Sequence, residues 1–468
     1  MSTPTTSLAG LARRDLAGLE DALVGPADPG YDEARAVHNG MIDRRPALIV
    51  RCSSPDDVAR TMAFARNHDV PLAVRGGGHN GAGLGVVDDG VVIDLAGMAE
   101  VFVDPASDTV RVGGGATWAQ VDAATAEHGR VTPAGIISTT GVGGLTLGGG
   151  IGHLTRRYGL TIDNLIGADV VLADGSQVYA SESEHPDLFW ALRGGGGNFG
   201  VVTSFEFRTH AIPSALQFGP TFWPIEQTPE VMAWYREFLP AAPRQLSGFF
   251  ATLTVPPVDL FPAELHMRKV CGVVWCIVGS EEEAARLLAP VHDVGTPLLH
   301  GVGPAPHPVL QSLFDGLYPK GQQAYWRADF FRELPDELAL EYREWGQKLP
   351  SMPSTMHLYP IDGAVHDVGP EDTAFAARDV RWAEVIFAVD PDPANAGAMR
   401  DWCVGHWEAT HPYSTGGAYV NFMMQEGQER VQATYRGNYD RLARVKAQYD
   451  PDNVFRINQN ILPASAAP

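Results

Sequence analysis

Two glycine-rich stretches, Arg75-Gly-Gly-Gly-His-Asn80 and Gly141-Val-Gly-Gly-Leu-Thr-Leu-Gly-Gly-Gly-Ile-Gly152, decide how this chain of 468 residues is interpreted. The first directly follows Pro71–Val74, an apolar run typical of a strand. Three glycines there leave backbone N–H groups unshielded, so the loop can surround phosphate oxygens. In the second stretch the glycines are too dense for a helix interior, and we expect a flat or bulky ligand to approach closely instead.

These stretches also fit other kinds of site. A glycine triplet taken alone fits an ordinary turn equally well, and a lone histidine such as His79 is more often structural than functional. The second stretch is not a P-loop, because no Gly-Lys-Ser/Thr follows it. The GxGxxG fingerprint of nicotinamide-binding domains is misplaced, since it opens a helix after the first strand. A nicotinamide dehydrogenase is therefore the weaker alternative.

The pattern of apolar residues predicts layers of helices and strands. Short β-branched runs alternate with helical patterns in the first half, as where Ser54 is placed to cap a helix over Asp56–Asn67. Such alternation favours an α/β or α+β fold. Around Ile212-Pro213 the glycine runs stop and tryptophan, phenylalanine and proline become common, which indicates a second domain.

Composition excludes several classes of function. The formal charge of −22 would repel nucleic acid and anionic membranes. The amino terminus shows no secretory signal, and no apolar run is long enough for a membrane helix. Four scattered cysteines without a CxxC pair support neither a disulfide framework nor a metal site. We expect a cytoplasmic protein that binds neither nucleic acid nor membranes and holds no metal.

Together the motifs resemble a known family. Besides the two glycine stretches they include Tyr158-Gly-Leu160, Leu188-Phe-Trp-Ala-Leu-Arg-Gly194, Tyr419-Val-Asn-Phe422 and Asn458-Gln-Asn460. This series is similar to the vanillyl-alcohol oxidase and p-cresol methylhydroxylase (PCMH) superfamily, in its berberine-bridge-enzyme-like branch. The resemblance is strong over residues 40–212 and good over 355–462.

The resemblance implies an α+β fold with three parts. A two-part FAD-binding domain of the PCMH type would span residues 1–212, with its core at about 43–212. A substrate domain, an antiparallel sheet covered by helices, would span 213–411. Residues 412–468 would return to the FAD-binding domain.

The resemblance also implies a covalent FAD. His79 matches the histidine that bonds the flavin 8α-methyl group, and Ile137 stands where some members have a second, cysteinyl link. A single histidyl link is therefore expected. The other expected cofactor-binding residues are Arg75, Gly76, Gly77, Gly78, Asn80, Pro133, Gly135, Thr139, Thr140, Gly143, Gly144, Gly149, Gly150, Gly152, Gly200, Val202, Asn421 and Asn458.

Two tyrosines match catalytic positions of the family. Tyr419 would remove the substrate proton while hydride leaves carbon, and Tyr359 would lower the pKa of Tyr419 or orient it. A free tyrosine has a pKa of about 10, so a base that works at neutral pH needs neighbours that lower it.

The function expected from the resemblance is oxidation of an alcohol or sugar hydroxyl of a small molecule, with O2 as the final acceptor. A tailoring step on a natural product is one such reaction. The alternatives are an amine oxidase of the 6-hydroxy-D-nicotine oxidase type and a flavin-binding protein without turnover.

Overall fold

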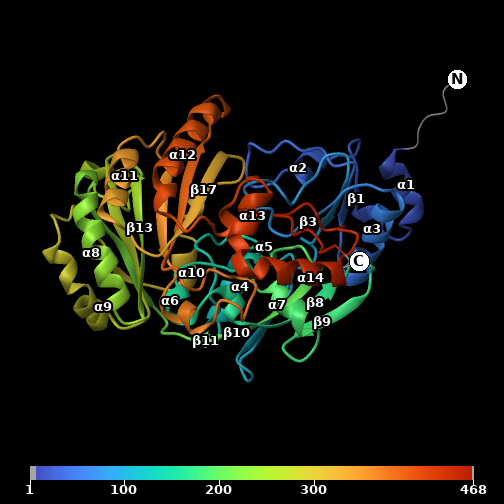
Figure 1. The fold of residues 1–468 in the computed structure, drawn as a ribbon, viewed down its shortest axis with the longest axis horizontal. Coiled ribbons are helices and arrows are strands. Elements are labelled where there is room, and N and C mark those ends of the chain that lie inside the picture. The colour runs from blue at the N-terminus through green and yellow to red at the C-terminus, as the bar shows by residue number, and fades with distance from the viewer. Residues whose placement is uncertain (1–6, 466–468) are drawn as a thin grey trace.

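The computed structural model describes residues 7–465, and the first part of the chain forms two larger sheets (Figure 1) and a two-stranded one of β7 (Arg130–Val131) and β11 (His210–Ala211). In a four-stranded sheet of order β1-β2-β4-β3, the last three strands run parallel. A five-stranded antiparallel sheet has the order β5-β6-β10-β8-β9. The strands of both larger sheets are β1 (Leu23–Val24), β2 (Leu48–Arg51), β3 (Leu72–Arg75), β4 (Val91–Asp94), β5 (Val101–Asp104), β6 (Thr109–Gly113), β8 (Leu165–Val171), β9 (Gln177–Ser181) and β10 (Val201–Arg208).

Helix α3 (Pro55–Asn67) connects the parallel strands β2 and β3. Its start is specified locally, because the Ser54 hydroxyl accepts from the Asp57 backbone N–H and the Asp57 carboxylate accepts from the Ser54 N–H. Pro55 occupies the first helical position, where no N–H is needed. The helix predicted over Asp56–Asn67 is confirmed.

The second part is one eight-stranded antiparallel sheet, in which the order β15-β12-β14-β13-β18-β19-β17 is joined by β16 at β12. Helices cover one face of this sheet, as Figure 1 shows, and the other face packs toward the first part. The expected fold class is therefore confirmed. The elements are β12 (Leu216–Pro224), α8 (Thr228–Ala241), β13 (Leu246–Thr254), β14 (Lys269–Ile277), α9 (Glu281–Leu288), β15 (Leu299–His300), β16 (Gly303–Ala305), β17 (Gln323–Phe331), α11 (Asp336–Gly346), β18 (Thr355–Pro360), β19 (Trp382–Asp390) and α12 (Ala396–Thr410).

The aromatic residues of this sheet divide between its two faces. Trp223, Trp275 and Phe331 belong to the core under the helices. Trp326 and Phe330 belong to the cluster on the opposite face, which also holds Ile151 and Leu160 of the first part. Only this second group lies near the glycine-rich stretches.

The second glycine stretch contains a helix, α5 (Val142–Gly148), so the expectation that its glycines exclude a helix is wrong. The reason is close packing. A Cβ on Gly141 would lie 2.3 Å from the Gly77 nitrogen, and one on Gly148 would lie 2.2 Å from Asn421 Oδ1. Glycine makes a helix less stable than alanine does by about 1 kcal/mol per residue, and these close contacts offset that cost. The glycines bring the first glycine stretch and the C-terminal segment against this helix.

Beyond about residue 411 the chain returns to the first part through α13 (Gln428–Tyr435) and α14 (Tyr439–Tyr449), which Figure 1 shows beside α5 and α7 (Pro186–Leu192). Lys446 of α14 is fully buried and donates to Asp450 at 2.6 Å and to the Asn198 carbonyl at 2.7 Å. This buried cation ties the last helix to the loop before β10.

Between residues 7 and 465, no helix is both long and apolar enough to cross a membrane. The four cysteines are buried and unpaired. In the same range, no group of three or more histidine, cysteine, aspartate or glutamate side chains is arranged to hold a metal ion.

Candidate active site

One cavity is enclosed by the two glycine-rich stretches, the inner face of the eight-stranded sheet and the C-terminal segment. It runs from Gly200 and Val202, at the start of β10, to Tyr359 on β18 and Trp326 on β17. Both predicted catalytic residues, Tyr419 and Tyr359, line it. So do these predicted cofactor-binding residues: His79, Arg75, Gly76, Gly77, Gly78, Asn80, Gly135, Thr140, Gly143, Gly144, Gly200, Val202, Asn421 and Asn458.

The remaining predicted residues, Pro133, Thr139, Gly149, Gly150 and Gly152, do not line the cavity. Two of them contact side chains that line the cavity. The Thr139 hydroxyl contacts His79 Nε2 at 3.1 Å, and the Gly150 N–H donates to the Tyr419 hydroxyl at 2.7 Å.

The loop over residues 76–80 has the form of an anion cradle. Among the described residues, none of its backbone N–H groups donates to a protein acceptor. The loop lies along the cavity wall, and Gly78 has a φ of +69°, which favours glycine. Across the cavity a Cβ on Gly144 would meet nothing within 4 Å. Free N–H groups beside open space fit the pyrophosphate of FAD.

Arg75 was expected to bind the cofactor, but its side chain has a structural role. Its guanidinium donates to Asp94 at 2.7 Å and bonds the Ala34 carbonyl. The arginine and Asp94 side chains are 9% and 8% exposed, so the ion pair is buried. The guanidinium therefore fixes the end of β3 and is not free to bind a phosphate.

His79 lies at the end of the cradle as a neutral imidazole. Its ring stacks on His38 with centroids 4.0 Å apart, and its Nδ1 lies 3.4 Å from the Thr140 hydroxyl. Burial, with a smaller contribution from His38, lowers the pKa of His79 to about 3. A neutral imidazole keeps a nitrogen lone pair, which a nucleophile needs. Ile137 also lines the cavity, so no thiol stands there.

Tyr419 presents its oxygen to two N–H donors. The Gly150 backbone and the Asn421 side chain both donate to this oxygen at 2.7 Å. Burial raises the pKa of Tyr419 to about 12, although both hydrogen bonds act to lower it. The expectation that neighbours lower the pKa below the ordinary value is therefore wrong for the protein without cofactor. Burial outweighs hydrogen bonding because no cation faces this hydroxyl.

Tyr359 contacts a histidine that the sequence analysis did not single out. Its hydroxyl lies 2.8 Å from His357 Nδ1. In the part of the chain that the structure describes, no hydrogen bond joins the hydroxyls of Tyr359 and Tyr419, whose rings both pack on Phe422. Tyr359 therefore does not orient Tyr419 by direct contact. The signal available in the sequence was the spacing His-x-Tyr in a strand, which places both side chains on one face.

The cavity contains almost no charge. Among the residues that line it, only Arg75 carries a permanent charge, and Asp94 compensates it. No aspartate, glutamate or lysine lines the cavity. The side chains available there to accept a proton are tyrosines and histidines. Part of the cavity wall is aromatic, with Trp326, Phe387 and Phe422, and the Trp326 ring lies against Gly81, just after the cradle.

Two buried ionisable residues outside the cavity have structural roles. Asp362 is buried and pairs with Arg156 at 2.6 Å, which joins the two parts of the chain. His153 is buried against Phe249, and burial lowers its pKa to about 3. Neither lines the cavity.

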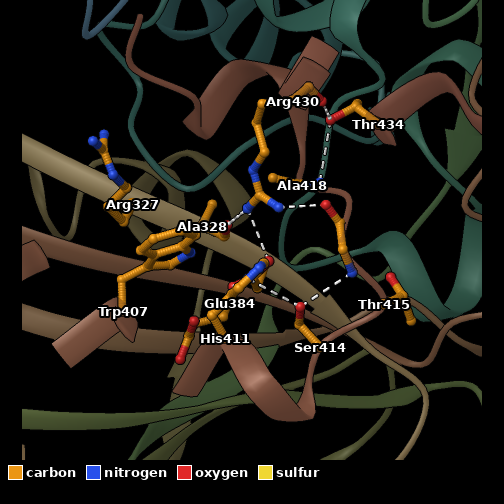
Figure 2. Close-up of polar contacts among 12 residues, drawn as sticks. Arg327, Ala328, Glu384, Trp407, His411, Ser414, Thr415, Ala418, Arg430 and Thr434 are labelled. Carbon is orange, nitrogen blue, oxygen red and sulfur yellow. Dashed lines mark hydrogen bonds and ion pairs between the residues drawn. The ribbon is translucent and has the colours of Figure 1, made fainter. Parts of the chain in front are cut away.

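A buried ionic network holds the segment that carries Tyr419. Figure 2 shows Arg430 of α13 extending toward β17, where it donates to the Ala328 carbonyl at 2.6 Å and to Asp329 at 2.8 Å. The same guanidinium bonds the Gly416 carbonyl, three residues before Tyr419. Asp329 is fully buried and also contacts His411 Nδ1 at 2.9 Å. This network joins the C-terminal segment to the edge of the substrate sheet.

Replacing Arg430 by methionine should destabilise the protein strongly. Loss of the guanidinium leaves Asp329 buried with an incomplete set of partners, and breaking such a pair costs about 3–5 kcal/mol. Arg332→Met is the matched control, because the Arg332–Asp379 pair is 58% and 45% exposed. Its loss should cost less than about 1 kcal/mol. Urea denaturation measures both, and equal losses would contradict the role given to Arg430.

Comparisons with known proteins agree with this geometry. Residues 46–181 match the family described as "FAD binding domain", and residues 418–462 match "Berberine and berberine like". The FAD-linked oxidoreductase YgaK of Bacillus subtilis is 32% identical over 93% of this chain and 95% of its own. The (R)-6-hydroxynicotine oxidase of Paenarthrobacter nicotinovorans is 27% identical over 95% and 97%.

Solved structures extend the similarity to the whole fold. The glucooligosaccharide oxidase of Acremonium strictum superposes with a TM-score of 0.86 at 25% identity, over 99% of this chain and all of its own. The 6-hydroxy-D-nicotine oxidase of Arthrobacter nicotinovorans superposes with a TM-score of 0.82 at 26% identity, over 94% and 98%. The geometry of the site agrees with this similarity, because the cavity is bordered by an anion cradle within the matched FAD-binding region and closed by the matched C-terminal segment. The chain belongs to the berberine-bridge-enzyme-like FAD-linked oxidases.

Proposed function

We propose that this protein carries FAD bound covalently to His79 and oxidises a neutral alcohol or sugar hydroxyl, with O2 as the final acceptor. The observation that carries the proposal is the cavity itself. A neutral imidazole ends a cradle of free N–H groups, and the proton-accepting side chains beyond it are uncharged.

The cofactor-binding residues divide by position. The loop over residues 76–80 would hold the pyrophosphate, and Gly200 and Val202 would contact the adenine end. Asn421 and Asn458 would close the site from the C-terminal segment. A related enzyme supports the covalent link, since the glucooligosaccharide oxidase of Acremonium strictum is described with a 6-S-cysteinyl, 8α-N1-histidyl FAD. Because Ile137 replaces a cysteine here, we propose the histidyl link alone.

When bound, the flavin would accept the hydride from the substrate carbon, and the protein supplies orientation and proton transfer. Tyr419 would take the hydroxyl proton. Its oxygen already accepts from Gly150 and Asn421, and these two donors stabilise negative charge on the phenolate while a further lone pair accepts the proton. Tyr359 would assist by orienting the substrate from the sheet face, where its hydroxyl lines the cavity.

The lack of charge in the cavity also bears on the substrate. A cationic amine would find no carboxylate there, and an anion would find no free arginine or lysine. Burying an unpaired charge is costly, so the cavity favours a neutral substrate. This supports a neutral alcohol over a cationic amine.

Anaerobic mixing tests the function. We expect a neutral aromatic or sugar alcohol to bleach the flavin absorbance and to yield one equivalent of carbonyl product, with hydrogen peroxide formed once air is admitted. Bleaching by amines and by no alcohol would overturn the alcohol assignment. A flavin that neither class reduces would indicate a binding protein without turnover.

A further inference from the structure

His357 and Tyr359 form a polar pair on the inner face of the substrate sheet. They are two residues apart on β18, so both side chains point to the same side, and His357 Nδ1 lies 2.8 Å from the Tyr359 hydroxyl. Both line the cavity, and they are 7% and 4% exposed. The pair is therefore a fixed part of the cavity wall.

Aromatic packing holds the two rings in place. The ring of Phe249, on the neighbouring strand β13, lies 4.8 Å from that of His357 and 5.1 Å from that of Tyr359. Phe422 lies 5.8 Å from Tyr359 on the other side. Phe249 and Phe422 offer no polar group, so among the described residues the only hydrogen bond of the pair is the one between its two members. Tyr318 and His153 lie near enough to interact with Tyr359 and His357 electrostatically without a hydrogen bond.

The pair can offer hydrogen-bond donors and acceptors to a ligand in the cavity. Burial lowers the pKa of His357 to about 3, so the imidazole is neutral and has one N–H and one lone pair. If the Tyr359 hydroxyl donates to Nδ1, the cavity faces a tyrosine lone pair and the Nε2–H group. If Nδ1–H donates to the tyrosine, the cavity faces its O–H group and the Nε2 lone pair. In both tautomers the pair presents one donor and one acceptor.

Both remaining groups need a partner. Among the described residues, His357 Nε2 has no hydrogen-bond partner, and Tyr359 has none besides His357. Nearby cavity residues such as Trp326, Val385 and Phe387 are predominantly apolar. Polar groups in an apolar wall are costly unless they are satisfied. Because both groups face the cavity, a ligand bound there can supply the missing hydrogen bonds.

We propose that His357 and Tyr359 form a recognition subsite for a neutral group with an adjacent donor and acceptor, such as a hydroxyl or carboxamide, on an aromatic or apolar molecule. This inference rests on the proposed function only in that the oxidised molecule occupies the same cavity. It assigns the substrate a second polar group, apart from the carbon that loses hydride, and makes His357 a specificity-determining residue.

Ligands that cannot be oxidised by hydride loss test the subsite without turnover. Benzamide carries the adjacent donor and acceptor, whereas fluorobenzene has a similar ring and no hydrogen-bond donor. Binding of each to the flavin-containing protein is measured as a shift of the visible flavin spectrum. In His357→Phe and Tyr359→Phe, the Kd of benzamide should rise about tenfold or more, because hydrogen bonds to buried groups are lost. The Kd of fluorobenzene should stay within about twofold, because the aromatic wall is kept.

Phe314→Leu is the control for shape, because Phe314 packs on Phe249 and His357 without hydrogen bonds. It should weaken both ligands alike. The proposal is overturned if wild-type protein does not bind benzamide more tightly than fluorobenzene, or if the tyrosine and histidine variants weaken both equally. Tyr359→Phe keeps the test valid if His357→Phe does not fold. Failure of alcohols to reduce the flavin would refute the proposed function and leave this binding result unchanged.

Discussion

His79→Ala protein is expected to lose all of its flavin on acid precipitation, whereas wild-type protein should give a yellow pellet. The backbone N–H groups of the cradle over residues 76–80 are kept in this variant, so FAD should still bind without a covalent link. The loss of the electron-withdrawing imidazolyl substituent makes the flavin a weaker oxidant, and we expect substrate-dependent reduction to slow by roughly tenfold or more. Absorbance of the pellet and supernatant measures the first effect, and anaerobic stopped-flow measures the second.

His128→Ala is the matched control for this variant, because His128 is exposed at the end of α4 (Trp118–Ala126), away from the cavity. It should retain its acid-stable flavin and its rate. Acid-stable flavin in His79→Ala would show that another residue forms the link.

Tyr419→Phe should lower the rate of flavin reduction by alcohols by about 10²–10⁴-fold, which is the usual contribution of a general base. The substitution removes the oxygen that accepts from Gly150 and Asn421 and keeps the ring. The two stranded donors should also reduce the free energy of unfolding by about 1–3 kcal/mol.

Tyr235→Phe controls for that loss of stability. Tyr235 lies in the core under the helices, where its hydroxyl donates to the Gly248 carbonyl at 2.7 Å. This variant should be destabilised and keep its rate. Near-normal oxidation of alcohols by Tyr419→Phe would exclude the phenolate mechanism, and the amine scheme, in which a neutral amine needs no strong base, would replace it.

The pH dependence of reduction follows from the same group. Burial raises the pKa of Tyr419 to about 12, so the phenolate fraction increases about tenfold for each pH unit across the neutral range. We expect kcat/KM to rise with pH in the wild-type protein, without a plateau below about pH 9. In Tyr419→Phe this rise should disappear. A wild-type profile that is flat between pH 6 and pH 9 would contradict the assignment.

The sequence predicted the layers of this fold better than it predicted the glycine stretches. Helix α3 was predictable because Ser54, Pro55 and Asp57 specify its start locally. Helix α5 was not, because its glycines are stabilised by contacts with Gly77 and Asn421 from distant segments. Intrinsic propensity argues against that helix, and tertiary packing outweighs it.

The candidate site shows the same limit. His79, Tyr419 and Asn421 stand in motifs, and the structure brings all three to one cavity. His38 and His357 stand in no motif, and their roles depend on a ring stack and a hydrogen bond that only the fold creates. The pKa shifts that burial causes were equally hard to predict from the sequence. The sequence gives no sign that Tyr419 is sealed from solvent, and that is why its expected pKa shift had the wrong direction.

Mass spectrometry of proteolytic peptides from the wild-type protein shows where the flavin is attached. A covalent link to His79 alone predicts one yellow peptide that contains Arg75–Asn80, with the added mass of one flavin located on His79 and none at the peptide that contains Ile137. Flavin on any other residue, or a full set of unmodified peptides from yellow protein, would contradict it.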